Sequence, residues 1–382
     1  MKMPRRRILF INQTSGYLMR DILHVFAEYH DVVLMASSPV EGVKYDKVSA
    51  YDRRSSVRRI ISWLIATVQI WCKVWGKYSD WELFIVSNPP FATLLPFFLK
   101  NRYSLFIFDI YPDVLVNQHF LSADNFIVKW WQKTNRKVYA RADQLFTISE
   151  GMRDCLCQYV AVERIQVVPL WTDKSNIHRI AIEDNYFMKE HHLENKFVVL
   201  YSGNLGNTHP VDVLIDVAKR VNDPDVIFVI IGEGGKKKLI EDRIEKEKCK
   251  NVKMLPRQPY DMLSYSLSVA DIAVITLDMN SSQLSVPSKT YNLLAIGVPL
   301  LCIASPDSEL GNLVRKYEVG GIFYPDEIDR IVDFILCIKN DIHLKRRYVH
   351  QAVKASSYYT VSNARILLNV FPCPYQNIKP ID

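Results

Sequence analysis

Two carboxylates stand close together in the stretch DIYPDV at residues 109–114. Asp109 follows an apolar run at 105–108 that is typical of a buried strand, and Asp113 lies four residues further on. The end of a strand in a parallel sheet is an edge where ligands bind, so this pair predicts a polar site. A helix N-cap is the competing explanation, and it applies most strongly to Asp113.

Glycines interrupt the chain directly after another expected strand, at residues 197–202. Gly203 and Gly206 form a loop, and Pro210 then opens a helical pattern at 211–221. Backbone N–H groups and the positive end of the helix dipole converge there, which makes a cradle for an anion such as phosphate. An ordinary strand-to-helix turn would show the same pattern. Gly16, after the strand at 7–12, is likewise either a glycine at a ligand edge or a simple turn glycine.

The elements that position these residues alternate between strand and helix. Strands are expected at 7–12, 32–36, 83–87, 105–108, 144–148 and 165–168, and then at 197–202, 226–231, 252–254, 272–275, 299–303 and 321–323. This order predicts two doubly wound, Rossmann-like α/β domains, 1–180 and 181–382, with a linker at 173–195 and an interdomain cleft. Neither glycine loop has the spacing of a dinucleotide or P-loop fingerprint, which argues against a dehydrogenase or an NTPase.

The composition is that of a folded protein, with 49% hydrophobic and 23% charged residues over 382 positions. Residues 1–80 carry 13 Lys and Arg against 7 Asp and Glu and so hold most of the net charge of +7. This bias indicates an anionic partner, either a membrane or a nucleic acid. The seven cysteines have no metal-ligand spacing, which is typical of reduced core residues in a cytosolic protein. The first apolar run is too short for a signal peptide.

Residues 53–75 combine arginines with a long apolar segment. Arg58, Ser62, Gln69 and Lys73 make one polar helical stripe, and nearly everything else from 60 to 75 is apolar. The run is shorter than the ~20 residues of a bilayer span. It is either a helix buried within the protein or a helix at a membrane interface with its arginines on lipid phosphates. The residues expected at such a membrane surface are Arg53, Arg54, Arg58, Arg59, Trp63 and Trp71.

Five stretches together resemble glycosyltransferase family 4, the retaining GT-B enzymes, and especially the bacterial branch that builds capsule, O-antigen and exopolysaccharide units. They are DIYPDV (109–114), TISEGMRD (147–154), VVPLWTD (167–173), YSGNLGNTH (201–209) and VPSKTYNLLAIGVP (286–299). The resemblance covers nearly the whole chain in the right order. It implies a UDP- or GDP-linked sugar donor on the C-terminal domain, an acceptor on the N-terminal domain, and a last helix that returns to the N-terminal domain.

The resemblance also implies the residues of each site. Lys289, at a helix N-terminus, is our first choice for the charge that meets the donor diphosphate, and Arg257 is the second. Either can instead be a solvated surface cation. The donor set is Gly203, Asn204, His209, Glu233, Arg257, Ser288, Lys289, Tyr291 and Asn292, and the acceptor-side set is Gly16, Tyr17 and Glu150.

Four positions depart from the family pattern. Asn204 and His209 stand where members often have an arginine and a lysine on the donor diphosphate. The two carboxylates of the family's Glu-x7-Glu pair fall on Leu284 and Asn292, so both are missing here. We interpret these departures as variation within the branch.

The resemblance implies a retaining transfer of a sugar from a nucleotide diphosphosugar to a polyprenyl-diphosphate-linked saccharide. Asp109 is the expected catalytic group, with Asp113 behind it. No metal-binding DxD motif is evident, so cations and helix dipoles would stabilise the leaving diphosphate, without a metal or cofactor. We expect the enzyme in the cytoplasm, peripheral on the inner face of the cytoplasmic membrane, with an anionic membrane surface as partner and no nucleic acid. A GT-B-fold sugar-nucleotide epimerase and a non-catalytic membrane-associated scaffold are the alternatives.

Overall fold

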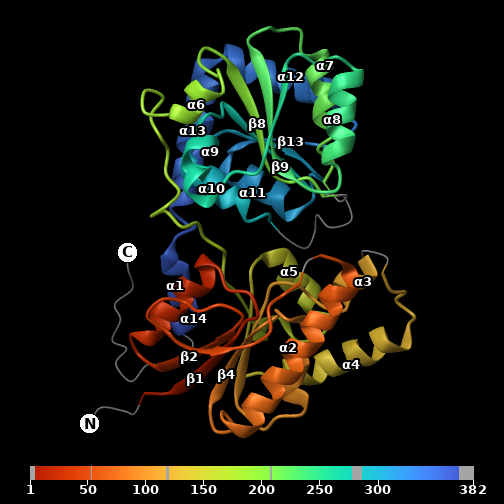
Figure 1. The fold of residues 1–382 in the computed structure, drawn as a ribbon, viewed down its shortest axis with the longest axis vertical. Coiled ribbons are helices and arrows are strands. Elements are labelled where there is room, and N and C mark those ends of the chain that lie inside the picture. The colour runs from red at the N-terminus through yellow and green to blue at the C-terminus, as the bar shows by residue number, and fades with distance from the viewer. Residues whose placement is uncertain (1–4, 53, 118–119, 207–208, 278–285, 370–382) are drawn as a thin grey trace. The chain divides into compact units, whose positions relative to one another are not determined.

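The computed structural model describes residues 5–52, 54–117, 120–206, 209–277 and 286–369 (Figure 1). The chain forms two compact units. Unit 1 comprises the residues up to Leu170 together with those from Val361 onward, and unit 2 comprises Trp171–Thr360. Each unit contains one sheet of parallel strands flanked by helices, which confirms the predicted fold class of two Rossmann-like domains.

The sheet of unit 1 has seven strands in the order β3-β2-β1-β4-β5-β6-β7. Helices flank a parallel sheet on its faces, so both faces of its central strands are filled with apolar side chains, as in β1, β4 and β5. The hydrophobic pattern does not predict the edge strand β3, because its sequence is Lys-Tyr-Asp-Lys. The strands are β1 (Arg7–Ile11), β2 (Asp31–Ala36), β3 (Lys44–Lys47), β4 (Glu82–Val86), β5 (Tyr103–Ile107), β6 (Gln144–Thr147) and β7 (Ile165–Val167).

Three helices of unit 1 begin at polar caps. The side chains of Ser55, Asn125 and Ser149 accept backbone N–H groups at the starts of α2, α4 and α5. The helices are α1 (Tyr17–Ala27), α2 (Ser56–Gly76), α3 (Asp113–Asn117), α4 (Phe126–Arg141), α5 (Glu150–Leu156) and α14 (Ala364–Asn369), with 3₁₀ segments η1 (Pro90–Phe97), η2 (Val162–Arg164) and η4 (Val361–Asn363). The C-terminal helix α14 packs against α1 within this unit.

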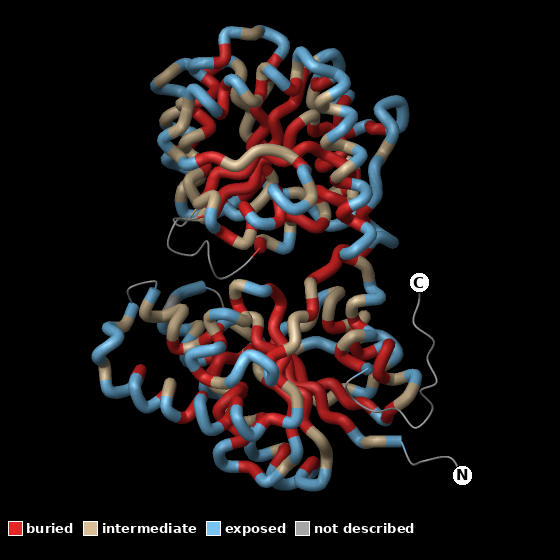
Figure 2. Tube along the Cα trace, turned by 180° about the vertical axis from the view of Figure 1, so that it is seen from behind, coloured by how far each residue is buried: buried red, intermediate tan, exposed pale blue. Residues whose placement is uncertain are grey.

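The sheet of unit 2 has six strands in the order β10-β9-β8-β11-β12-β13. Every one of them overlaps an expected strand within about three residues, because buried parallel strands are short continuous apolar runs. The strands are β8 (Phe197–Asn204), β9 (Val226–Glu233), β10 (Val252–Leu255), β11 (Ile272–Thr276), β12 (Leu300–Ile303) and β13 (Gly320–Phe323). In Figure 2 both sheets are buried and the helices around them carry the exposed residues.

The helices of unit 2 fill the gaps between these strands. Gly297 ends α10 with φ +75°, a left-handed conformation that glycine adopts without strain. The helices are α6 (Tyr186–Glu190), α7 (Val213–Arg220), α8 (Lys237–Lys246), α9 (Leu263–Ser268), α10 (Lys289–Ile296), α11 (Glu309–Tyr317), α12 (Ile328–Asn340) and α13 (Ile342–Ser356), with the 3₁₀ segment η3 (Tyr260–Met262).

Both sheets reverse their strand order once, and the reversal locates a ligand edge. In unit 1 the chain runs outward from β1 to β3 and then from β4 to β7 on the other side; in unit 2 the reversal lies between β8 and β11. In open parallel sheets, ligands bind beyond the carboxyl ends of the two strands that flank such a reversal. The loops after β1, β4, β8 and β11 are therefore the first places to look for a site.

The cysteines are not the buried core set that the sequence predicts. Cys249 and Cys302 are buried, but Cys72, Cys157 and Cys337 are exposed and Cys155 is half-buried. The correction has a simple cause: Cys72 and Cys337 lie on helices, where sequence position alone does not say which face is turned inward. Among the described residues, no helix is long and apolar enough to cross a bilayer.

Candidate functional site

A cavity of about 350 Å³ lies at the strand reversal of unit 1. Its walls come from the segments after β1, β4 and β5, from the start of α1 and from one side of α2. Three of the residues predicted for this side of the molecule, Gly16, Tyr17 and Asp109, line it. Asn12 and Asn88, which follow β1 and β4, add polar groups to the wall.

Asp109 is held by its backbone at the edge of this cavity. The Ser87 hydroxyl oxygen accepts the backbone N–H groups of Phe108 at 2.9 Å and of Asp109 at 3.1 Å, which ties the end of β4 to the end of β5. No described residue donates a hydrogen bond to the Asp109 carboxylate, which solvent reaches through the cavity. The surrounding protein raises its pKa by desolvation. A carboxylate of this kind is ready to accept a hydrogen bond from a ligand hydroxyl.

Aromatic rings form another part of the cavity wall. Tyr51 and Trp63 stack with their ring centroids 5.8 Å apart and their planes 5° from parallel, and Tyr111 meets Trp63 edge-on at 6.0 Å. Trp63 is 8% exposed. It therefore lines the cavity and does not lie on the outer surface of α2, which corrects the prediction of a membrane contact for this residue. Sugars pack their C–H faces on such rings, so the wall suits a saccharide.

Asp113 and Glu150 are not among the residues that line this cavity. Asp113 opens α3, and its carboxylate accepts hydrogen bonds from the Tyr159 hydroxyl and from Gln158 Nε2. Glu150 opens α5 and pairs with Arg153 one helical turn later. Both carboxylates thus have protein partners that account for them structurally.

The strand reversal of unit 2 brings Gly203 and Lys289 together. A Cβ atom at Gly203, on β8, would lie 3.0 Å from Lys289 Nζ, so the amine rests directly against the glycine. Lys289 is the first residue of α10, and its Nζ lies 3.9 Å from the centroid of the Tyr201 ring. The Lys289 amine is buried, and no described residue accepts a hydrogen bond from it.

Burial lowers the pKa of Lys289 to about 7. A buried amine without an acceptor is costly in its charged form, because protein does not replace the water that it loses. An anion placed beside it would supply the missing partner and favour the ammonium form. The pair Gly203–Lys289 is therefore a site that an anionic ligand completes, next to the N-terminus of α10.

The loop after β8, with Gly206, packs against the loop after β9, with Gly234. The Asn204 side chain lies where a Cβ at Gly206 or at Gly234 would collide with it, 2.8 Å and 2.9 Å away. His209 Nδ1 is 3.1 Å from the carbonyl oxygen of Thr276, the last residue of β11. Residues 207 and 208 lie outside the described residues. The glycines thus leave room for Asn204 at the edge of the site.

The other predicted donor residues are placed unequally. Glu233, at the end of β9, pairs with Lys237 at 2.8 Å, and Arg257 is exposed in the loop after β10. Asn292 accepts a hydrogen bond from the Thr172 hydroxyl. The remaining two residues of the donor set also lie on or beside α10: Ser288 is exposed just before it, and Tyr291 is buried against Tyr359. Leu284 lies outside the described residues.

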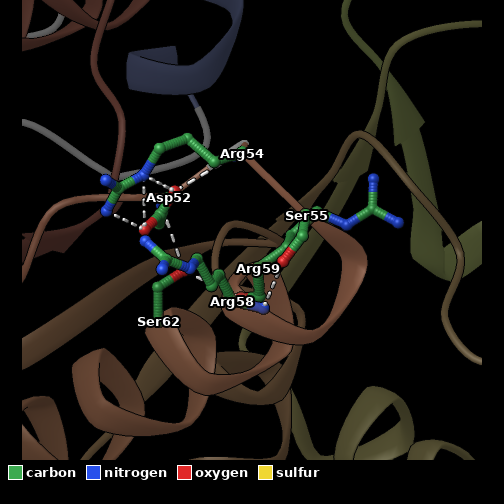
Figure 3. A network of polar contacts seen from close by, with 6 residues as sticks. All are labelled: Asp52, Arg54, Ser55, Arg58, Arg59 and Ser62. Carbon is green, nitrogen blue, oxygen red and sulfur yellow. Dashed lines mark hydrogen bonds and ion pairs between the residues drawn. The ribbon is translucent and has the colours of Figure 1, made fainter.

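Arginines gather where α2 begins in unit 1 (Figure 3). Arg54 makes an ion pair with Asp52 at 2.7 Å, and the Ser55 side chain caps the helix at Arg58 N. Arg59 places its guanidinium carbon 5.6 Å from the centroid of the Trp63 ring. Arg53 lies outside the described residues. The cluster therefore adjoins the aromatic wall of the cavity.

Some residues of these sites were not predicted. Tyr51, Ser87 and Tyr111 build the cavity, and Tyr201 supports the amine of Lys289. A rule could have found Ser87, because polar residues directly after the strands that flank a reversal point to the ligand edge. No group of three or more metal-ligating side chains occurs among the described residues.

Comparison with known proteins agrees with this architecture. Residues 183–355 match the family described as glycosyl transferases group 1. WcaI of Escherichia coli (strain K12), which carries the name of a colanic acid biosynthesis glycosyl transferase, is 28% identical over 194 residues, 50% of this chain and 48% of WcaI. WbjE of Pseudomonas aeruginosa, named as a glycosyltransferase, is 23% identical over 63% of this chain and 62% of its own. The chain thus matches about half to three fifths of these relatives.

Solved structures resemble the chain over almost its full length. Sucrose-phosphate synthase from Thermosynechococcus elongatus superposes with a TM-score of 0.74 at 12% identity, covering 96% of this chain and 98% of its own. HepE from Anabaena, solved with UDP and glucose, gives 0.72 at 16% identity over 96% and 99%. WaaG, a glycosyltransferase involved in lipopolysaccharide biosynthesis, gives 0.68 at 14% identity over 94% and 99%. Such identities concern the fold, and the chain has the GT-B fold.

Proposed function

We propose that this protein is a retaining glycosyltransferase of cell-surface polysaccharide synthesis. It moves a sugar from a UDP- or GDP-linked donor to a saccharide carried on a polyprenyl diphosphate, at the inner face of the cytoplasmic membrane. The match of residues 183–355 to glycosyl transferases group 1 supports the class of activity. The assignment to family 4, and to its branch for capsule, O-antigen and exopolysaccharide, rests on the sequence stretches quoted above.

The observation that carries the proposal is the buried amine of Lys289 against Gly203, which has no hydrogen-bond acceptor among the described residues. A donor diphosphate placed there would receive a charge-assisted hydrogen bond and the field of the α10 N-terminus. Both interactions strengthen as the diphosphate leaves and gains negative charge, so they favour the transition state over the bound donor. HepE, whose structure holds UDP, has the same fold and supports a nucleotide in this role.

The cavity of unit 1 supports the acceptor half of the proposal. Its aromatic wall suits a sugar ring, and the Asp109 carboxylate would accept a hydrogen bond from the attacking hydroxyl and orient it. In the transfer, this oxygen bonds to the anomeric carbon while the bond from that carbon to the diphosphate oxygen breaks. The bonding electrons leave with the nucleoside diphosphate, and the hydroxyl proton passes to the departing oxygen.

The orientation of α2 supports a membrane-bound acceptor. Three of the four residues of its polar stripe contact the protein: the Ser62 hydroxyl accepts from Asp52 N, Gln69 Oε1 accepts from Ser49 N, and Lys73 pairs with Asp46. Its other side is apolar and exposed, with Ile61, Leu64, Ile65, Val68, Trp71 and Trp75 each at least 43% exposed. An exposed apolar face beside exposed arginines is typical of a helix lying in an anionic membrane interface.

A donor screen tests this function. The purified protein is incubated with UDP- and GDP-linked sugars, with and without polyprenyl-diphosphate saccharides extracted from bacterial membranes, and nucleoside diphosphate release is measured. We expect release that depends on one donor and rises with the acceptor. A sugar-nucleotide epimerase would convert its donor without any lipid, and a scaffold would release nothing from any donor.

A further inference from the structure

The charge of Arg59 lies at the border between the unit 1 cavity and the start of α2. Its guanidinium stands beside Trp63, whose ring is part of the cavity wall, and its charge acts on Tyr111, another wall residue. Arg59 Nε is buried, and no described residue accepts a hydrogen bond from it. Arg59 also makes no ion pair with any carboxylate among the residues that the structure describes.

Its neighbour Arg54 is different. The Arg54 guanidinium donates to both oxygens of Asp52, at 2.7 Å and 3.0 Å among other contacts, so its charge is already balanced (Figure 3). The Asp52 carboxylate is correspondingly held at a pKa of about 2 by these hydrogen bonds. Of these two arginines, Arg59 is therefore the one whose charge a ligand anion can complete. The third arginine of the cluster, Arg58, is exposed, and its charge acts on the Asp52 carboxylate.

The described residues that line the cavity include no Lys, Arg or His to balance the charge of a phosphate. Asp109 is the charged residue in its lining, and the other polar groups are amides and hydroxyls such as Asn12, Asn88 and Ser87. A carboxylate repels phosphate but accepts hydrogen bonds from sugar hydroxyls. The volume of about 350 Å³ lies at the small end of ligand pockets and suits roughly one or two sugar rings. The cavity thus favours an uncharged sugar, and the Arg59 guanidinium carbon lies 5.6 Å from the centroid of Trp63, one ring of the cavity wall.

We propose that Arg59 binds the phosphate that joins the acceptor sugar to its lipid, while that same sugar fills the cavity. This inference rests on the proposed function and sharpens its substrate: the acceptor is a lipid diphosphate that bears a single sugar, or at most a very short chain. The lipid would then continue along the exposed apolar face of α2, which starts at the same end of the helix. The cavity would bind the sugar, Arg59 the phosphate and the apolar face of α2 the lipid. These three parts follow one another in the same order along the covalent structure of the acceptor.

This places the protein early in the assembly of a saccharide on its lipid. The acceptor must be supplied by a phosphoglycosyl transfer, in which a lipid phosphate oxygen attacks the sugar-bearing phosphorus of a nucleotide sugar. A new phosphoanhydride bond forms, the old one breaks, and nucleoside monophosphate leaves with the bonding electrons. The product here would be a lipid-linked disaccharide, the substrate for further transfers.

Direct binding tests the inference without membranes and without turnover. The probes are octyl diphosphate esters of glucose, galactose, N-acetylglucosamine and N-acetylgalactosamine, the corresponding octyl glycosides, and octyl diphosphate without sugar. Calorimetry uses the full chain below the micelle concentration. We expect at least one sugar diphosphate to bind about tenfold or more tightly than both its glycoside and octyl diphosphate, since a charge-assisted contact is gained.

Two arginine variants locate the effect. Arg59→Gln should bring the sugar diphosphate to within about threefold of its glycoside, and Arg59→Lys should restore part of the preference, because it keeps the charge but loses the planar fork. Arg102→Gln is the matched control. Arg102 comes directly before β5, at the amino ends of the strands and away from the cavity, and its guanidinium pairs with Asp143. Its loss should leave the preference for the diphosphate intact.

Four outcomes would overturn the inference, and the first three are that no probe binds, that the diphosphate brings no gain over the glycoside, and that Arg59→Gln retains the preference. The inference is also overturned if octyl diphosphate binds as tightly as the sugar diphosphates, because the site would then recognise the diphosphate and not the sugar. The proposed function fails separately, through absence of nucleoside diphosphate release in the donor screen. If nucleoside diphosphate is released with membrane extract, but the protein binds sugar diphosphates no more tightly than glycosides, the proposed glycosyltransferase function holds. Only the assignment of Arg59 to the lipid phosphate is then wrong.

Discussion

Replacing Lys289 by Met should weaken donor binding and also remove its dependence on pH. Methionine keeps the length of the apolar stem and removes the amine, so no large cavity is left. The lost interaction is a charge-assisted hydrogen bond to a diphosphate in a buried site, for which about 1.5–3 kcal/mol is typical. That corresponds to a dissociation constant about 10- to 150-fold higher for the nucleotide sugar.

The pKa of Lys289 adds a signature that a general loss of structure would not give. In the free protein this pKa is about 7, lowered mainly by burial, so the amine is mostly neutral at pH 8. A bound diphosphate favours the charged form and raises the pKa, so binding takes up a proton. Affinity should therefore fall as pH rises above 7, by up to about tenfold per unit. The diphosphate of a nucleotide sugar is fully ionised throughout this range.

Calorimetry at pH 8 in two buffers of different ionisation enthalpy measures this uptake. We expect uptake of roughly half a proton to one proton for the wild type and none for Lys289→Met. Lys196→Ala serves as the control. Lys196 comes directly before β8, at the other end of the strand that carries Gly203, and its amine pairs with Asp225. Equal affinity and equal proton uptake in the wild type and Lys289→Met would refute the assignment of the donor site.

Three further predictions concern unit 1. Asp109→Asn should cut the transfer rate and leave nucleotide-sugar affinity nearly unchanged; a normal rate in steady-state kinetics would make Asp109 structural. Tyr159→Phe should lower the free energy of unfolding by about 1–3 kcal/mol, because the Asp113 carboxylate loses a donor, while the transfer rate per folded molecule stays the same. Denaturant titration checks the stability, and a selective loss of turnover would restore a catalytic role for Asp113. Leu64→Asp with Val68→Asp should abolish co-sedimentation with anionic vesicles, which in the wild type should weaken as salt rises; unchanged sedimentation would place the membrane contact elsewhere.

The sequence predicts the sheets well because a buried parallel strand is a continuous apolar run. β8 and β12 show such runs, and so does β5. The edge strand β3 has no such run, so only its pairing with β2 reveals it. The sequence of this chain therefore predicts a strand wherever that strand is completely buried.

The site is less legible, because it depends on which way side chains point. The sequence places Lys289 at a helix N-terminus, but only the fold shows that its amine is buried against Gly203 and Tyr201. In α2, both Trp63 and Trp71 fit a membrane face by residue type, and the packing separates them: Trp63 lines the cavity and Trp71 is 43% exposed. A helix with apolar residues on most of its circumference does not reveal its inward face, so this distinction requires the tertiary structure.

Mass spectrometry of the acceptor after reaction tests the central claim most directly. A lipid diphosphate bearing one sugar is incubated with the wild type and the donor selected by the screen, and both the lipid product and the nucleoside diphosphate are quantified. We predict that the acceptor gains the mass of one sugar residue, with one nucleoside diphosphate released for each product formed. An acceptor of unchanged mass, across the UDP- and GDP-linked sugars and across lipid-linked acceptors of different length, would contradict the proposal that this protein is a glycosyltransferase.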